Sequence, residues 1–515
     1  MNFGTNASIM PTQNNETDSE YKRRVICIGD GSALAEERSK IQAIKHNLVY
    51  RGILDNSTLL DDGCYHTSIY DITLIELQNK INDDVKLIVL DIDETYYKSV
   101  TEYYNTINMG QTLQNTIEVE FINQKMQNPF VQLVNENKTF CIMPFVALYK
   151  DGSKSRVCCY MSSPVTTTYT DFNTDPALNK IRTDLLLPNR PIEQCKYCYN
   201  LENNNVISPR QTYTINWTYK LNLKSFDDVV RRTTLLDYDI RLTNKCNLLC
   251  RSCAPGASHL IGKEYFKIGL TNTNTGLKTV ESYDIIDLTT VRRVYVAGGE
   301  PTIDTEFFKF LQKCIDLNKL DFEFIINTNA VVTSQKFLNL IKHFTNLKFE
   351  ISLDGFDEIN HYVRWPSNWG KIKTNIIKLN QVSAGRISTN TVVSIYNIGR
   401  LYKLFEFLEN TYPIAQRHLS ILVNPDVQQA YNFPDKKFAL DDLEKMKLLR
   451  TYQIDATFKS KVDYLITEIT NSDINFDLLE KFFKFNDKLD TSRGVKLYDY
   501  IPELEACREL TTKQI

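Results

Sequence analysis

Residues 243–253 read TNKCNLLCRSC and follow LDYDIRLT (236–243), a run with the composition of a β-strand. Cys246, Cys250 and Cys253 therefore have the spacing C-x3-C-x2-C on the loop after that strand. Thiolates are soft ligands that suit iron–sulfur clusters, and such clusters normally take four of them. Three thiolates on one tight loop would leave one iron open to a ligand from outside the chain.

The same three thiols fit two other kinds of site. A structural zinc ion takes four protein ligands, and the nearest candidate for the fourth is His259. Three unrelated thiols are the remaining alternative. The spacing alone leaves all three readings open.

Outward from this loop, strand-like and helical stretches alternate. The strand-like runs lie at 236–243, 292–298, 322–328, 347–353, 389–395 and 418–424, with helical patterns such as 304–319 and 334–344 between them. This alternation predicts parallel strands joined by right-handed crossovers, and hence an α/β barrel over about 236–425. Active sites of such barrels gather at the carboxyl ends of the strands, which is where the cysteine loop lies.

A second motif follows the next strand, where residues 294–303 read VYVAGGEPTI. Together with CNLLCRSC it resembles the radical S-adenosylmethionine (SAM) superfamily, whose domain is a partial (β/α)6 barrel. The resemblance implies an oxidoreductase or modifying enzyme in which Cys246, Cys250 and Cys253 hold a [4Fe–4S] cluster. The open iron of that cluster would bind SAM. One electron, from a donor such as flavodoxin or ferredoxin, would cleave SAM to a 5′-deoxyadenosyl radical that abstracts hydrogen from substrate.

The resemblance also implies the residues that bind SAM. In the GGEP element, the glycines would let the backbone approach the methionyl group, and the glutamate would accept from its ammonium. Polar residues that end the third and fourth strands occupy positions used around ribose and methionine, although such residues are common at strand ends. Ser252 stands where many members have an aromatic residue. The implied SAM-binding residues are Gly298, Gly299, Glu300, Pro301, Asn327, Asn329, Ser352 and Asp354.

Residues 138–210 have poor periodicity and further cysteines, so a metal is expected to order them. FCIMPFVALYKDGSKSRVCCYM (140–161) and EQCKYCYNLE (193–202) resemble the SPASM/twitch type of auxiliary cluster domain, here placed before the barrel. The resemblance implies a second [4Fe–4S] cluster held by Cys141, Cys158, Cys195 and Cys198, with Cys159 as an alternative to Cys158. A four-cysteine zinc site is the competing interpretation.

The rest of the chain is less specific. Residues 1–22 are expected to be a disordered tail, 23–105 a small α/β domain of flavodoxin-like or SGNH-like type, 105–137 a linker, and 435–515 a helical extension. Asp30, Ser32 and His66 could suggest a hydrolase in the N-terminal domain, but the serine is displaced from the usual GDS order. A recognition or docking role is therefore the favoured expectation for this domain.

The amino-acid composition limits the classes of protein to which this chain can belong. The chain has 515 residues, a net charge of −3 and 12 cysteines, with no basic block. Nucleic-acid binding is not indicated, no apolar run approaches the roughly 18 residues of a membrane helix, and no secretory signal is recognised. We expect a cytoplasmic protein with reduced thiols. A peptide or protein is the favoured substrate, and a small metabolite or nucleotide-sugar is the alternative. The competing function is that of a zinc-binding scaffold without enzymatic activity.

Overall fold

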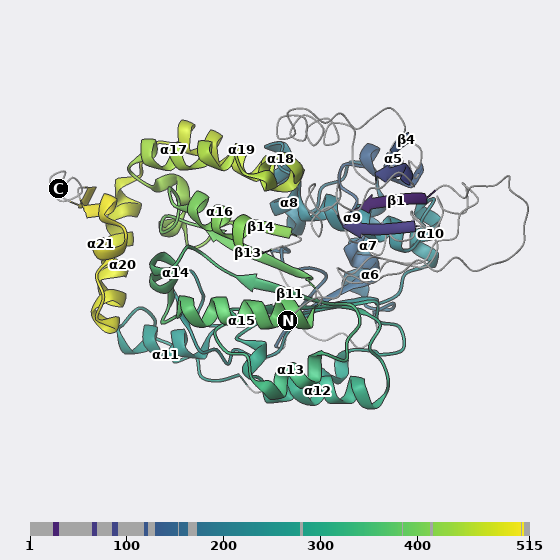
Figure 1. Cartoon of the computed structure of the whole chain (residues 1–515), viewed down its shortest axis with the longest axis horizontal. Helices are drawn as coiled ribbons and strands as arrows, with labels where there is room; N and C mark the ends of the chain where they lie inside the picture. The colour runs from purple at the N-terminus through teal and green to yellow at the C-terminus, as the bar shows by residue number, and fades with distance from the viewer. Residues whose placement is uncertain are drawn as a thin grey trace, which may run out of the picture. The chain divides into compact units, whose positions relative to one another are not determined.

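The computed structural model describes residues 24–29, 64–68, 85–90, 118–121, 129–152, 154–162, 172–278, 282–383, 385–412, 416–505 and 507–508. The chain divides into two compact units, residues 1–132 with 219–222 and residues 133–218 with 223–515. Figure 1 shows both units and labels many of their helices and strands.

The first unit contains a four-stranded parallel sheet. Its strands are β1 (Arg24–Gly29), β2 (Cys64–Ser68), β3 (Val85–Leu90) and β4 (Glu118–Phe121), in the order β2-β1-β3-β4. Strands β1, β2 and β3 lie within 23–105, where an α/β domain was predicted, whereas β4 lies in the stretch predicted to be a linker. Asp30 and Ser32 lie outside the described residues, so the hydrolase alternative and the type of this domain stay predictions.

The second unit is built on a sheet in which six neighbouring strands are parallel and follow one another in chain order. They are β7 (Asp237–Arg241), β9 (Arg293–Val296), β10 (Glu323–Thr328), β11 (Leu347–Ser352), β13 (Ile387–Val393) and β14 (Gln416–Ile421). Each corresponds to one of the six predicted runs. The result is an α/β fold with a mostly parallel sheet, consistent with a partial barrel.

Helices cover one face of this sheet because alternate strand residues are apolar. Figure 1 shows α12 (Thr305–Asp316), α13 (Gln335–Ile341) and α15 (Trp369–Val382) along that face. Helix α12 buries Phe307, Phe310, Leu311 and Cys314, and the first two contact Phe324 of β10 edge-on. The crossover helices therefore fix the strands whose carboxyl ends carry the predicted site.

The cysteine-rich segment joins the same sheet. Strand β5 (Ala147–Asp151) pairs in parallel with β7, and β6 (Lys154–Arg156) pairs antiparallel with β5, which extends the order to β14-β13-β11-β10-β9-β7-β5-β6. Short helices surround this hairpin, namely α6 (Met143–Val146), α7 (Pro176–Leu186), α8 (Lys196–Asn203) and α9 (Pro209–Lys220). The auxiliary cluster domain predicted over 138–210 stays a prediction, and β5 and β6 within it continue the sheet of the second unit.

The end of the chain is helical, as predicted, with α17 (Lys436–Met446), α19 (Ala456–Asn471) and α20 (Phe476–Arg493). Helix α20 holds the cysteine loop through Arg251, whose side chain is fully buried. The guanidinium donates to Asn486 Oδ1 at 2.9 Å, forms an ion pair with Asp490 and lies 3.6 Å from the ring centre of Tyr362. Arg251 therefore anchors the segment between Cys250 and Cys253.

Two glycines allow the loops after β7 and β9 to touch. Gly298 and Gly299 have φ of +81° and +54°, which disfavours any side chain. A Cβ on Gly299 would lie 2.3 Å from the carbonyl oxygen of Lys245, and one on Gly298 would lie 2.9 Å from the Cβ of Arg241. The next residue, Glu300, donates its backbone N–H to that same Lys245 carbonyl at 2.8 Å. The GGEP loop is thereby fixed against the residue that precedes Cys246.

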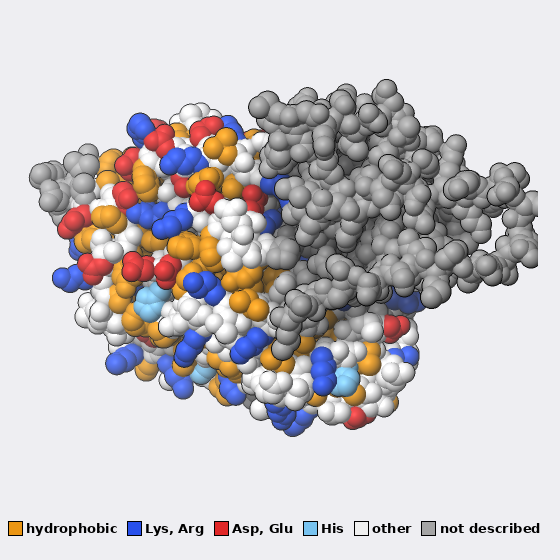
Figure 2. All heavy atoms as spheres, in the orientation of Figure 1, with side chains coloured by type: hydrophobic (Ala, Val, Ile, Leu, Met, Phe, Trp, Pro, Cys, Tyr) orange, Lys and Arg blue, Asp and Glu red, His pale blue; other side chains and the backbone are white. Residues whose placement is uncertain are grey.

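The surface of the described part carries charges of both signs, and Figure 2 shows Lys and Arg interspersed with Asp and Glu on the face in view. Among the described residues, no helix is both long enough and apolar enough to cross a bilayer.

We predict that Gly299→Ala lowers the free energy of unfolding by at least about 2 kcal/mol, because it adds both a left-handed alanine and a clash with Lys245. Urea unfolding of the full chain measures the loss. Gly494→Ala is the control, since Gly494 also has a positive φ of 66° but has open space around it, so strain alone should cost about 1 kcal/mol. Equal losses in the two variants would contradict the tight contact.

Asp490→Ala should destabilise the chain by about 3–5 kcal/mol, because it leaves the buried guanidinium of Arg251 without its ionic partner. Asp487→Ala on the same helix is the matched control. It removes an ion pair with Arg508 in which both side chains are at least 40% exposed, and less than about 1 kcal/mol should be lost. The anchor is refuted if both variants unfold at the same urea concentration.

Candidate active site

The three cysteines lie at the carboxyl end of β7 on a loop with local structure of its own. Cys250 belongs to the short strand β8 (Leu249–Cys250), which pairs antiparallel with β12 (Arg364–Trp365), and Cys253 donates its N–H to the carbonyl of Cys250 at 3.2 Å. All three thiols are free and half-buried. Burial raises the pKa of Cys246 and Cys253 to about 12, and the charge of Cys250 adds to both shifts. Binding of a metal would therefore have to displace protons from neighbouring thiols.

Arg364 is a charged neighbour of this loop that sequence reasoning missed. Its Cα pairs in register with that of Cys250, and its Nε lies 2.8 Å from Asp354 Oδ2. Burial raises the pKa of Cys250 and Cys253, and the positive charge of Arg364 lowers both. Arg364 follows helix α14 (Glu358–Val363) rather than a strand, so an inspection of strand ends passes over it.

Glu300 is buried, and its carboxylate already has internal donors. Oε1 accepts from the Thr302 amide and hydroxyl and from the Thr328 hydroxyl at 2.6 Å, while Oε2 accepts from the Asn329 N–H at 2.8 Å. Burial raises its pKa, and these hydrogen bonds lower it. The carboxylate therefore ties the end of β9 to the end of β10. Its neighbour Pro301 is buried at the start of a short 3-10 helix.

The remaining predicted SAM-binding residues fall into two groups. Asn329 donates to Asn247 Oδ1 at 2.9 Å, so it reaches the cysteine loop directly. Asp354 is fully buried and accepts from the Val392 N–H at 2.8 Å, in addition to its ion pair with Arg364.

Asn327 and Ser352 lie together near the carboxyl ends of β10 and β11. Ser352 Oγ donates to Asn327 Oδ1 at 3.3 Å, and Asn327 Nδ2 donates to Glu350 Oε2 at 3.0 Å. This pair continues into a polar group around Glu350 that the sequence reasoning missed.

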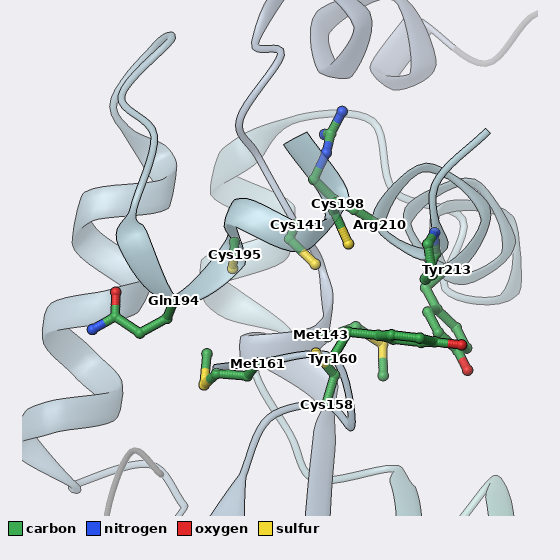
Figure 3. A pocket seen from close by; sticks show the side chains of 11 residues that line it. Cys141, Met143, Cys158, Tyr160, Met161, Gln194, Cys195, Cys198, Arg210 and Tyr213 are labelled. Atoms are coloured by element: carbon green, nitrogen blue, oxygen red, sulfur yellow. The ribbon is translucent and has the colours of Figure 1, made fainter. Parts of the chain in front are cut away.

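Four upstream cysteines meet at one small, largely apolar cavity. Cys141, Cys158, Cys195 and Cys198 all line it, and Figure 3 shows the four side chains reaching the same space from different elements. Cys141 precedes α6, Cys158 follows β6, and the other two flank the start of α8. Cys159 is not among the residues that line this cavity. The structure thus brings together residues that are up to 57 positions apart in the sequence.

Arg210 is the buried cation of this cavity and was also missed. Its guanidinium forms an ion pair with Glu202 at 2.6 Å and donates to the Phe140 carbonyl. Burial raises the pKa of Cys141, Cys195 and Cys198, and the charge of Arg210 lowers all three. The cation therefore favours thiolates at this cavity.

In the part of the chain that the structure describes, no three or more His, Cys, Asp or Glu side chains are gathered closely enough to hold a single metal ion, so neither cysteine group is arranged here as a finished ligand set. His259, the candidate fourth zinc ligand, accepts the backbone N–H of Cys246 at its Nδ1 over 3.3 Å. That nitrogen is therefore already occupied.

Comparison with solved structures gives distant matches. Native anSMEcpe with bound AdoMet and Cp18Cys peptide is 17% identical over 41% of this chain and 61% of that chain, with a TM-score of 0.28. Streptococcus suis SuiB bound to S-adenosylmethionine is 15% identical over 56% of this chain and 52% of that chain, with a TM-score of 0.26. The FeFe-hydrogenase maturase HydG from Carboxydothermus hydrogenoformans is 10% identical over 56% of this chain and 68% of that chain, with a TM-score of 0.22.

A search of curated proteins found no match to this sequence. Among protein families, the Radical SAM superfamily matches residues 240–408, which run from β7 through α16 (Leu401–Thr411) and include both motifs. The chain therefore contains a radical SAM superfamily domain over these residues.

Proposed function

We propose that this chain is a radical SAM enzyme that modifies an unactivated C–H bond, with Cys246, Cys250 and Cys253 as ligands of its SAM-cleaving [4Fe–4S] cluster. The observation that carries the proposal is the placement of three half-buried thiols at the carboxyl end of β7, fixed by backbone contact to the GGEP loop. A set of three thiolates on one loop fits a cluster that keeps one iron for an outside ligand.

The residues around these thiols have separate tasks in this proposal. A bound cluster would supply the electron that cleaves SAM into methionine and a 5′-deoxyadenosyl radical. Glu300 Oε2, which has a single internal donor, would accept from the ammonium of SAM. Arg364, which is paired with Asp354, lies beside Cys250 and favours the thiolate forms of Cys250 and Cys253. Arg251 holds the cysteine loop through its ion pair with α20, and Asn329, which follows β10, holds the loop through its side-chain hydrogen bond.

We further propose that Cys141, Cys158, Cys195 and Cys198 bind an auxiliary [4Fe–4S] cluster, as in SPASM/twitch proteins. Its support is the shared cavity and the buried cation of Arg210, whose charge lowers the pKa of Cys141, Cys195 and Cys198 although Glu202 is paired with it. Such a cluster would bind substrate or take the electron left after hydrogen abstraction. A peptide or protein is the proposed substrate, with flavodoxin or ferredoxin as the electron donor and the cytoplasm as the site of action.

Anaerobic reconstitution with iron and sulfide tests the proposal. The wild-type chain should turn brown, bind about eight irons and form 5′-deoxyadenosine under reduction. Cys250→Ala should lose about four irons and all cleavage of SAM. Cys198→Ala should also lose about four irons, yet retain some uncoupled cleavage because its first site is intact. Stoichiometric zinc in a colourless protein, or full 5′-deoxyadenosine formation by Cys250→Ala, would instead support a scaffold or another site.

The CC pair provides a matched test of the second site. Cys158 lines the cavity and its neighbour does not, so Cys158→Ser should lose about four irons while Cys159→Ser keeps all of them. Iron analysis and the visible spectrum of both variants, reconstituted side by side, measure the difference. Loss of iron from Cys159→Ser alone would reverse the assignment.

A further inference from the structure

The face of the barrel strands that points away from the helices carries a cluster of polar side chains to which the proposed function gives no role. Strand residues alternate between two faces. On β10 and β11, Phe324, Ile326, Phe349 and Ile351 are fully buried in the core with the helices. Glu350, between Phe349 and Ile351, faces the other way and contacts Tyr295 of β9 and His418 of β14. Glu350 is the centre of this group.

The two carboxylate oxygens of Glu350 have different surroundings. Oε2 accepts from Tyr295 Oη at 2.6 Å and from Asn327 Nδ2 at 3.0 Å. Oε1 faces His418 Nε2 at 3.8 Å, which is too long for a hydrogen bond. The side chain of Glu350 is 14% exposed and that of His418 is 36% exposed, so neither side chain is completely enclosed by protein.

Glu350 has no ionic partner other than His418 among the described residues. Burial lowers the pKa of His418 to about 4, so its ring is neutral at pH 7. Burial opposes ionisation of Glu350, but the charge of a protonated His418, the hydrogen bonds from Tyr295 and Asn327 and the charge of Lys348 bring its pKa below the ordinary value. At pH 7, where His418 is neutral, the two hydrogen bonds and Lys348 remain. Glu350 is therefore an anion at neutral pH with no cation in contact.

The cations of this region are already engaged elsewhere. Arg241 makes two hydrogen bonds to the carboxylate of Asp239, at 3.1 and 3.3 Å. Lys348 donates to Gln416 Oε1 at 2.5 Å, and Lys461 donates to the Leu419 carbonyl at 2.6 Å. A largely buried carboxylate without a cationic partner is costly, and a ligand that brings the missing charge would recover that cost.

We propose that Glu350 binds a positively charged nitrogen of the substrate, an ammonium or a guanidinium, at Oε1, while Tyr295 and Asn327 hold the carboxylate through Oε2. The inference rests on the proposed function, because Asn327 also contacts Ser352 and both are assigned to SAM. The substrate site therefore adjoins the cofactor site through shared hydrogen bonds. An anionic substrate group is disfavoured here, since Arg241 is already neutralised by Asp239.

The test uses the full chain reconstituted anaerobically with iron and sulfide. n-Butylammonium chloride is the probe, and 1-butanol, which is similar in size but neutral, is the comparison. Binding is measured as the rise in unfolding temperature over a concentration series. We expect the ammonium to stabilise the wild-type chain, and Glu350→Gln to bind it at least about tenfold more weakly. Glu306→Gln on helix α12, which removes an exposed pair with Lys309, should bind as the wild type does.

Two results would overturn the inference. One is equal stabilisation of the wild-type chain by butylammonium and butanol, which decides the matter even if Glu350→Gln does not fold. The other is equal affinity of Glu350→Gln and the wild type for the ammonium.

Two further measurements are needed. One distinguishes a peptide from a free amine as the source of the cation, and the other distinguishes failure of this inference from failure of the proposed function. A blocked tripeptide with a central lysine, titrated in parallel, should bind more tightly than butylammonium if the source is a peptide, and no more tightly if it is a free amine. Cleavage of SAM is measured in the same preparation. Glu350-dependent ammonium binding without cleavage would refute the proposed function alone, whereas cleavage without such binding would refute this inference alone.

Discussion

The loops after β7 and β9 meet through the backbone alone, because the Lys245 carbonyl accepts from Glu300 where Gly299 leaves no room for a side chain. Cys246 is the next residue after Lys245, so this contact sets where the cysteine loop begins. Asn329 and the carboxylate of Glu300 then extend the contact to the end of β10. From the sequence, Gly298 and Gly299 were expected to let the backbone approach a cofactor. The structure shows that the contact between the two loops also requires both glycines, whether or not a cofactor is bound.

Both groups of cysteines lie beside a buried arginine that has a carboxylate partner from another segment. Arg251 pairs with Asp490 next to the triplet, and Arg210 pairs with Glu202 at the four-cysteine cavity. A buried ion pair adds little to stability by itself because both charges lose their hydration. Its value here is positional, since each pair fixes a segment that lies next to the thiols. Arg210 also favours the charged form of the thiols around it.

The six barrel strands could be predicted because each is an apolar run with helical spacing after it, and local pattern suffices for that. The two cysteine groups were visible from their spacing. The extension of the sheet by β5 was not, because strand pairing joins residues that are 90 positions apart, such as Ala147 and Asp237. Arg251 and Asp490 are 239 positions apart, and nothing in either local sequence identifies the other. Which residue of the adjacent pair Cys158 and Cys159 enters the cavity depends on side-chain direction, which spacing does not encode.

The pairing of β5 with β7 has a mechanical consequence. Cys141 and Cys158 flank the β5–β6 hairpin, Cys246 follows β7, and a continuous ladder of five paired residues joins the two strands. Neither thiol-bearing segment can swing away from the other without breaking that ladder. Electron tunnelling weakens steeply as the gap between donor and acceptor grows. Clusters bound as proposed, on the segments that flank these two strands, would therefore keep a nearly constant gap and a nearly constant tunnelling rate, whatever moves at the periphery of the molecule.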